Sequence, residues 1–256
     1  MQDPAYERLN GAGQAPILVL CDHATNRVPP SVAGGDLGLP AAEMARHIAH
    51  DIGARGVAVE LSRRLDAPAL LTRFSRLVID PNRGEFDPTL LMRLYDGTII
   101  PGNRDADAEE RERRLDAWHR PYHQAITAEI DAMLAAGREP ALVSIHSFTP
   151  RLRGRPARPW HVGVLWDRDD RVARPLIERL AAESDIVVGD NEPYHGALEG
   201  DTMFRHGTMR GLRHVLIEIR QDLIATPEEQ VGWAARLAPI LREVLDAPAA
   251  AGAGGG

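Results

Sequence analysis

The sequence predicts an α/β fold in which a mixed, largely parallel sheet is flanked by helices. Three apolar runs, residues 17–21, 141–147 and 214–220, have the length of buried strands. Helical patterns separate these runs, and strands that alternate with helices are typical of a mostly parallel sheet. Polar residues end or interrupt each run. The strands that build the core are therefore also expected to carry reactive side chains to one edge of the sheet.

In the first half of the chain, the strand at 17–21 is followed by Pro29 and Pro30, which prevent a helix from starting there. Residues 41–55 then show a helical pattern, because Met44, Ile48 and Ile52 recur at spacings of four on one face. The remaining elements expected in this half are a helix over 57–65 and strands over 68–74 and 76–79.

The second half opens with a long helical pattern over residues 106–136, which Pro121 is expected to kink. Thr226 is expected to cap the last helix of the chain. The elements expected after the long helix are strands over 141–147, 160–166, 186–188 and 214–220 and helices over 171–184 and 227–245.

The chain shows no internal repeat and no linker, so we expect one domain over residues 16–246. Residues 1–15 are expected to form a flexible N-terminal arm. Residues 247–256 consist of alanine, proline and glycine in the tail of the sequence, and we expect them to be disordered.

The composition is that of an ordinary globular protein, with 256 residues, 44% hydrophobic and 26% charged residues. The net charge of −7 argues against nucleic acid as a partner, because phosphate binding needs clustered positive charge. No apolar run approaches the ~20 residues that span a bilayer, and the N-terminus lacks the apolar core of a secretory signal. A single cysteine excludes an internal disulfide. We therefore expect a cytoplasmic protein without a membrane partner.

All 30 basic residues are arginine. The absence of lysine excludes Schiff-base chemistry and the phosphate-binding P-loop, both of which need a lysine amine. Arginine offers a planar fork that suits carboxylates and phosphates.

Two histidines, His23 and His146, follow or end buried strands, which is a suitable placement for the ligands of a catalytic metal. Catalytic zinc takes three protein ligands from His, Asp and Glu and keeps one position open. Asp51, Asp22 and Asn26 are alternatives for the third ligand. A lone histidine after a strand is more often structural, so the pairing of two strand ends is what favours a metal.

Glu218 is the best general base in the sequence. It interrupts the apolar run Val215–Ile219, and burial would raise its pKa into the range useful for accepting a proton from water. The alternative is a glutamate at a strand edge that faces solvent.

Arg73, Arg76, Asn82 and Arg83 form a further polar group around the strand expected near residue 70. Such residues could bind the carboxylate of a substrate and polarise its acyl oxygen. Ordinary salt bridges would explain the arginines equally well.

The sequence contains two further candidates for chemistry, a cysteine nucleophile and a second pair of histidines. Cys21 could be a nucleophile with His23 or His146 as its base, but its place in an apolar strand favours a buried, inert thiol. His119 and His123 share one helix face and could bind zinc, but no third ligand lies nearby in sequence. Positions in the core or at a helix cap are the favoured interpretation for these two histidines.

Seven motifs in one order, from about residue 16 to 225, resemble those of the N-formylglutamate amidohydrolase family. They are Cys-Asp-His-Ala-Thr-Asn-Arg-Val-Pro at 21–29, His-Ile-Ala-His-Asp-Ile-Gly-Ala at 47–54, Arg-Phe-Ser-Arg-Leu-Val-Ile-Asp-Pro-Asn-Arg at 73–83, Pro-Tyr-His at 121–123, Ser-Ile-His-Ser-Phe-Thr-Pro at 144–150, Asp-Asn-Glu-Pro-Tyr at 190–194 and Ile-Glu-Ile-Arg-Gln-Asp at 217–222. Together they cover most of the chain.

The resemblance implies a fold like that of the zinc carboxypeptidases and aspartoacylases. It implies that His23 and His146 bind zinc, that Glu218 is the base and that Arg76 polarises the carbonyl. Asn82 and Arg83 match the carboxylate clamp of the family.

Asn26 departs from the pattern, because the relatives have glutamate three residues after the first histidine. Asp51 is therefore the preferred third ligand, and Asn26 joins Arg73 among the expected substrate-binding residues. The opening Asp-His-Ala-Thr-Asn-Arg also looks like a branch distinct from the enzymes of histidine degradation, which leaves the exact formyl amino acid open.

The sequence thus predicts a zinc-dependent amidohydrolase that cleaves a small anionic N-acyl amino acid, such as N-formylglutamate. The residues expected at its site are Glu218 and Arg76 for catalysis, Asn26, Arg73, Asn82 and Arg83 for substrate, and His23, Asp51 and His146 for the metal. The alternatives are a carboxypeptidase- or amidase-like hydrolase that acts on peptides or cell-wall fragments, and an inactive binding protein for acidic amino acids.

Overall fold

A seven-stranded sheet in the order β1-β3-β2-β6-β9-β7-β8 forms the centre of the computed structural model, which describes residues 3–246. Strands β3, β2, β6 and β9 are parallel, β1 and β7 run antiparallel to their neighbours β3 and β9, and β8 is parallel to β7. The strands are β1 (Tyr6–Leu9), β2 (Ile17–Cys21), β3 (Ala69–Thr72), β6 (Ala141–Phe148), β7 (Val162–Leu165), β8 (Val188–Asp190) and β9 (His214–Arg220), with a separate hairpin of β4 (Leu94–Tyr95) and β5 (Thr98–Ile99).

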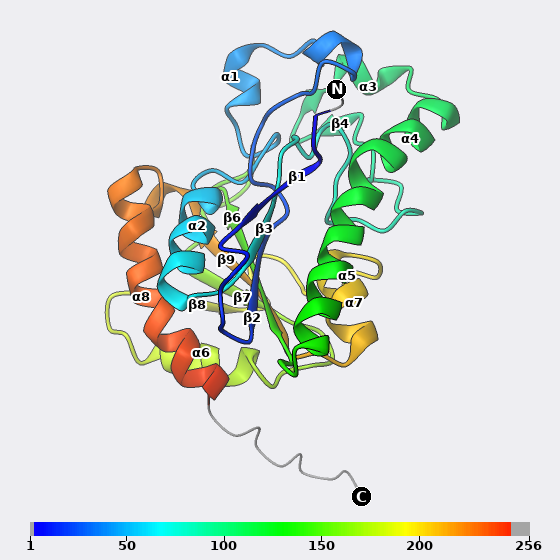
Figure 1. Cartoon of the computed structure of the whole chain (residues 1–256). Coiled ribbons are helices and arrows are strands. Elements are labelled where there is room, and N and C mark those ends of the chain that lie inside the picture. Colours follow the sequence, from blue (N-terminus) through cyan, green and yellow to red (C-terminus); the bar gives the residue numbers. More distant parts are fainter. Residues whose placement is uncertain (1–2, 247–256) are drawn as a thin grey trace, which may run out of the picture.

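Helices cover both faces of the sheet (Figure 1). Helices α2, α6 and α8 pack on one face, and α5 and α7 lie on the other. The helices are α1 (Ala41–Met44), α2 (Ala54–Leu65), α3 (Pro101–Arg104), α4 (Ala108–Arg114), α5 (Arg120–Ala135), α6 (Ala173–Ala181), α7 (Thr202–His206) and α8 (Pro227–Asp246). The predicted mixed, largely parallel sheet between helices is confirmed.

The alternation of side chains along the strands separates two cores. Val19 of β2 and Val143 of β6 point towards α2 and α8, whereas Leu20 and Leu142 point towards Tyr122 and its neighbours on α5. Both faces of the central strands are buried, which explains why these strands read as continuous apolar runs. This packing fixes the position of the polar residues at the ends of the strands.

The helix predicted over residues 41–55 is wrong in its second half. Helix α1 ends at Met44 and α2 begins only at Ala54, after irregular turns. Gly53 has a φ of 81°, and a Cβ atom there would lie 2.1 Å from the carbonyl oxygen of Ile224, so only glycine fits. The break at Gly53 turns Asp51 towards the ends of the central strands, where its backbone N–H donates to the carbonyl of His23 at 3.0 Å.

Two other expectations about local structure are wrong. Residues 76–79 form a turn after β3 instead of a strand, with the N–H of Val78 donating to the carbonyl of Ser75. In the N-terminal arm, residues 6–9 form β1, which completes the edge of the sheet by pairing with β3. The tail at 247–256 lies outside the described residues, so the disorder expected there is a prediction that stands as made.

The long helical run is interrupted as its proline suggested. A π-helical turn over Leu115–His119 joins α4 to α5, immediately before Pro121. Proline lacks the N–H that would continue the regular ladder, so a local change of hydrogen-bond pattern is expected there. Thr226 caps α8 through a hydrogen bond from the N–H of Glu229 to its Oγ1, and the Glu229 carboxylate accepts from the N–H of Thr226.

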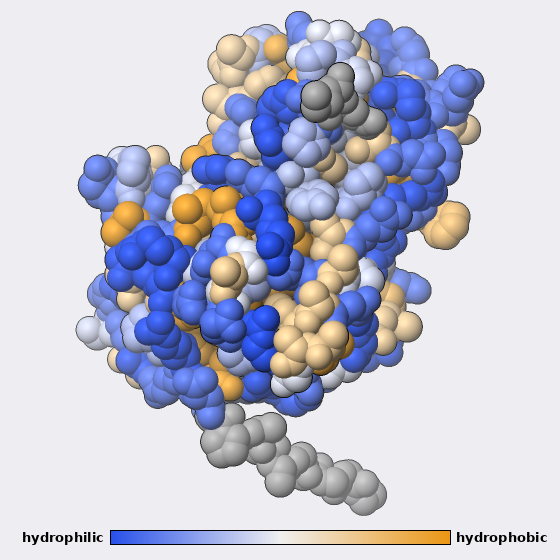
Figure 2. Space-filling view, in the orientation of Figure 1, coloured by the Kyte–Doolittle hydropathy of each residue, from blue (hydrophilic) through white to orange (hydrophobic). Residues whose placement is uncertain are grey.

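The face shown in Figure 2 is mostly hydrophilic, and its apolar residues form small separate groups. Among residues 3–246, no helix combines the length and the hydrophobicity that a membrane crossing requires.

Candidate metal centre and active-site cavity

The carboxyl ends of three parallel strands bring the predicted site residues together. His23 follows β2, His146 lies near the end of β6, and Glu218 occupies the position of β9 directly opposite His146. Asp51 reaches the same place from the turn before α2. Four side chains from distant parts of the sequence thus meet at one sheet edge, where open α/β sheets hold their ligands.

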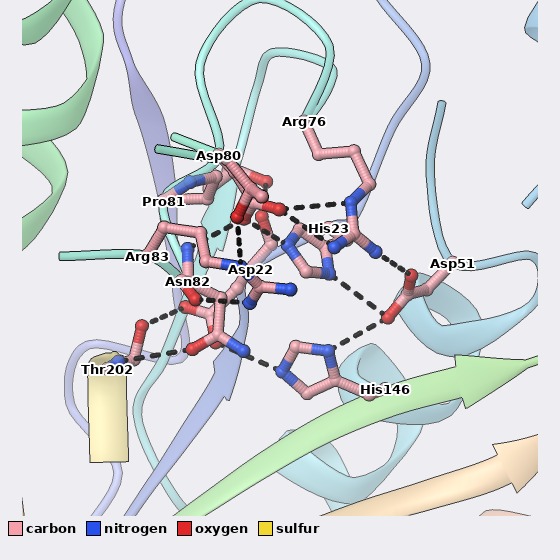
Figure 3. A network of polar contacts seen from close by, with 12 residues as sticks. Asp22, His23, Asp51, Arg76, Asp80, Pro81, Asn82, Arg83, His146 and Thr202 are labelled. Carbon is pink, nitrogen blue, oxygen red and sulfur yellow. Dashed lines mark hydrogen bonds and ion pairs between the residues drawn. The ribbon is translucent and has the colours of Figure 1, made fainter. Parts of the chain in front are cut away.

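His23, Asp51 and His146 form a compact, buried cluster (Figure 3). Oδ2 of Asp51 lies 2.9 Å from Nδ1 of His146 and 3.3 Å from Nδ1 of His23. One donor atom from each residue falls within 4.8 Å of the others, and all three side chains are at most 3% exposed. The structure therefore brings the three predicted ligands to one point.

The Nε2 atom of each histidine contacts a second carboxylate. Nε2 of His23 lies 2.7 Å from Oδ1 of Asp80, and Nε2 of His146 lies 3.0 Å from Oδ2 of Asp22. Metal-binding histidines commonly donate their other ring N–H to a carboxylate, which fixes the tautomer and the ring orientation. In both histidines this arrangement leaves Nδ1 free to face Asp51.

These residues fit a divalent metal. Two imidazole nitrogens and one carboxylate are a donor set of catalytic zinc sites, and three protein ligands leave a further position for water or substrate. Burial alone would raise the pKa of Asp51, but the two histidines outweigh it and lower that pKa. The carboxylate is therefore ionised, as a metal ligand must be.

Glu218 contributes a buried carboxyl group to the site. Its side chain lies in the cavity at 7% exposure, and among residues 3–246 no polar atom pairs with its Oε2. Burial raises the pKa of Glu218 to about 7, with His146 acting in the opposite direction. A carboxyl group with such a pKa can accept and return a proton near neutral pH.

Arg76 is tied to carboxylates on two sides. Its Nη2 donates to Oδ2 of Asp80 at 2.7 Å, and its Nη1 lies 3.4 Å from Oδ1 of Asp51. Asp80 consequently links Arg76 to His23. The pKa of Asp80 is held well below its usual range, because Arg76 and His23 outweigh the effect of burial.

Asn82 and Arg83 follow Asp80 in a short loop and also line the cavity. The Oδ1 atom of Asn82 accepts from the N–H of Thr202 at 3.1 Å, which fixes the side-chain amide. Nη1 of Arg83 donates to the carbonyl of Asn82 at 2.7 Å, and within the described residues Arg83 forms no ion pair. Its positive charge is available to a bound anion.

A model of the N-formylglutamate amidohydrolase family matches residues 15–225, which is most of the chain. The chain belongs to this family. The N-formylglutamate deformylase of Pseudomonas putida is 25% identical over 261 residues, an alignment that covers 94% of this chain and 95% of that protein. The resemblance read from the motifs is confirmed.

Two solved structures share the fold of this chain. The crystal structure of a gene product of Agrobacterium tumefaciens is 36% identical, covers 95% of this chain and 96% of its own, and superposes with a TM-score of 0.89. The N-formylglutamate amidohydrolase of Ralstonia eutropha shares the fold at 20% identity, with a TM-score of 0.66 and coverage of 94% and 99%.

Two residues expected to bind substrate in this family member lie elsewhere. Asn26 does not line the cavity, and its Nδ2 donates to the carbonyl of Met44 at 2.8 Å, which closes the loop after β2. Arg73 is exposed at the end of β3 and is also absent from the cavity lining.

Cys21 is fully buried, and burial together with Asp51 and Asp22 raises the pKa of its thiol. A thiolate is therefore disfavoured, which argues against the nucleophile alternative. His119 and His123 occupy buried positions, and their Nε2 atoms donate to the carbonyls of Arg83 and Pro81, at 3.0 and 2.9 Å. The interpretation of these two histidines as core residues is confirmed, and they support the loop that carries Asn82.

Sequence reasoning missed the residues that surround the ligands. Asp80 and Asp22 hold the two histidines, and Asp22 is in turn fixed by Tyr122, Ser144 and Thr202. Asp22 was recognised only as an alternative ligand. The signal that could have found Asp80 is its place directly before Pro81-Asn82-Arg83, in the loop that follows β3.

Proposed function

We propose that this chain is a zinc-dependent amidohydrolase that cleaves the amide bond of a small N-acyl amino acid. The observation that carries the proposal is the buried cluster of His23, Asp51 and His146 with the unpaired carboxyl group of Glu218 beside it. The names of its relatives make N-formylglutamate the first compound to test.

A zinc ion bound by these three residues would activate a water molecule and polarise the acyl carbonyl. Glu218 would accept one proton from the attacking water while the oxygen of that water bonds to the acyl carbon. It would then return the proton to the amine nitrogen as the C–N bond breaks, so that a free carboxylic acid and a free amino acid leave. The raised pKa of Glu218 suits both transfers.

Asn82 and Arg83 would hold the carboxylate of the substrate. The Nδ2 group of Asn82 points to this role, because Oδ1 is already occupied by Thr202. Arg83 supplies a cation with no carboxylate partner in the described chain. Arg76 lies beside Asp51 and would stabilise the negative charge that develops on the acyl oxygen.

The size of the cavity favours a small substrate. Its volume is about 270 Å³, which is near the lower end for small-molecule sites and small for a stretch of peptide. An amidase that acts on peptides or cell-wall fragments, the second function considered, would need a longer groove.

The test is a Glu218→Gln variant, assayed for release of free amine from N-formylglutamate and other N-formyl amino acids, beside a zinc determination on the same sample. Hydrolysis by the parent and retention of zinc without turnover in the variant would support the proposal. Tight binding of acidic amino acids by a parent that neither holds zinc nor hydrolyses amides would favour the inactive binding protein instead.

A further inference from the structure

We infer that the side-chain part of the cavity accepts a neutral, apolar amino-acid side chain in preference to the carboxylate of glutamate. The inference rests on the proposed function and narrows its substrate class to N-acyl derivatives of apolar amino acids. Two independent features of the cavity support it, an apolar wall below Glu218 and the charges that surround the cavity.

The apolar wall follows from the pleat of β9. Glu218, Leu216 and His214 are separated by two residues each, so their side chains share one face of the strand, and all three line the cavity. Leu165 of β7 pairs directly with Leu216 and lies in the lining as well. Two leucine side chains therefore lie in the lining one pleat along the strands from the proton acceptor.

Helix α7 closes this part of the cavity from the other side. Met203 and Phe204 both line it, and Met203 packs in the same core cluster as Leu165 and Leu216. Leu198, in the loop before α7, adds a further apolar side chain to the lining. A substrate side chain here would exchange water for aliphatic and aromatic contacts, which favours an apolar group.

The charges in the lining leave no cation for a second carboxylate. Arg83 can serve one carboxylate, and Arg76 is already paired with Asp80 and Asp51. Of the lining histidines outside the metal cluster, His47 is neutral, because burial lowers its pKa to about 4.

The two remaining lining histidines already form hydrogen bonds within the chain. Both ring nitrogens of His214 are engaged, with the carbonyl of Leu212 and the hydroxyl of Thr208. His195 is exposed, and its Nδ1 accepts from the N–H of Ala197.

Acidic groups make a second carboxylate still less favourable. Asp167, Asp201 and Glu218 line the cavity, and Asp201 is only 3% exposed and forms no ion pair within the described residues. A substrate that brought a side-chain carboxylate here would bury it beside acidic groups and leucine side chains, without a cationic partner. Discrimination against glutamate would thus come from the cost of burying an unpaired carboxylate as well as from apolar contact.

The experiment measures kcat/KM of the zinc-loaded protein for N-formyl-L-leucine, N-formyl-L-methionine and N-formyl-L-glutamate. We expect the two apolar substrates to be hydrolysed at least about tenfold more efficiently than the glutamate derivative. Equal or better hydrolysis of N-formyl-L-glutamate would overturn the inference and leave the proposed function intact. Hydrolysis of none of the three would overturn both.

A pair of variants at Phe204 tests whether the substrate side chain lies against α7. Phe204 is half-buried, so a Phe204→Arg variant can place a cation in the lining without burying it completely. We expect the preference to shift towards N-formyl-L-glutamate by about tenfold or more, whereas Phe204→Leu keeps the apolar preference. An unchanged preference in a folded Phe204→Arg protein would contradict the placement of the substrate side chain against α7.

Discussion

His146 and Glu218 occupy directly opposite positions on the adjacent parallel strands β6 and β9. One residue belongs to the cluster that could hold a metal, and the other is a buried carboxyl group whose Oε2 has no hydrogen-bond partner within residues 3–246. Register in a sheet whose two faces are buried is strongly specified, so the distance between these groups is fixed by the core. The pairing of β6 with β9 therefore places the proposed metal ligand, His146, beside the proposed proton acceptor, Glu218.

Glu218→Gln removes the proton acceptor and keeps the shape of the side chain. We expect turnover to fall by at least ~100-fold, with the zinc content unchanged, because Glu218 is not among the three ligands. Single-turnover assays beside elemental analysis check this. Near-normal turnover in a variant that retains its metal would remove Glu218 from the mechanism.

The pH dependence of kcat/KM should report the same group. Burial places the pKa of Glu218 near 7, and only the ionised carboxylate can accept a proton. Activity should therefore rise with pH and level off once Glu218 is ionised, and the positive charge of bound zinc is expected to move the midpoint below 7. The zinc-loaded protein is assayed from about pH 4.5 to about pH 8.5, and a profile that is flat across that range would contradict the role.

Asp80 is expected to matter for metal affinity although it is not a proposed ligand. Asp80→Asn weakens the support of His23 and releases Arg76, and such changes behind a metal ligand typically cost ~10–100-fold in affinity. Competition with a chelator measures the loss. Asp87→Asn is the matched control, because Asp87 lies in the same loop but does not line the cavity. An affinity equal to that of the parent would show that Asp80 does not support the site.

His123 holds the backbone of the loop that carries Asn82 and Arg83, through its hydrogen bond to Pro81. His123→Leu should raise KM by about tenfold or more with a smaller effect on kcat, because the proposed carboxylate clamp moves while the metal cluster is retained. Steady-state kinetics together with thermal unfolding distinguish this effect from general destabilisation. A KM equal to that of the parent in a folded variant would mean that the loop is held without this bond.

Asp201 links stability to pH. Burial raises its pKa to about 7, so between about pH 4 and pH 7 the folded state holds a proton that the unfolded state has released. Stability from this group is complete at low pH and is lost as the pH rises through 7, by on the order of 4 kcal/mol.

Asp201→Asn should remove that dependence and keep the cap of α7, since asparagine also accepts from the N–H of Phe204. Urea unfolding of parent and variant at several pH values measures the difference. A constant difference in stability across that pH range would contradict the raised pKa.

Much of the site could be predicted from the sequence because apolar runs that stop at polar residues mark the ends of buried strands. His23, His146 and Glu218 each belong to an apolar run, and runs of this kind form the parallel centre of an α/β sheet, whose carboxyl ends converge. Asp51 was found only through the family resemblance and a pattern on a helix that the structure breaks at Gly53. A residue that the structure places in the cluster with His23 and His146 was thus reached from an incorrect local structure.

The remainder depended on contacts that sequence patterns do not encode. Arg73 and Arg76 are both near β3, yet only Arg76 turns into the cavity, because the strand ends at Thr72 and the chain bends there. Asn26 has the polarity of a site residue but caps a local loop. The support of His146 by Asp22 joins residues 124 positions apart, a pairing that follows only from the assembled sheet.

The most direct test of the account is elemental analysis of the purified parent protein beside a His23→Ala/His146→Ala double variant, both after incubation with zinc and removal of the excess. The account predicts about one zinc per chain in the parent and none in the variant, because two of the three proposed ligands are lost. A parent that retains no metal, or a folded variant that retains as much as the parent, would contradict it.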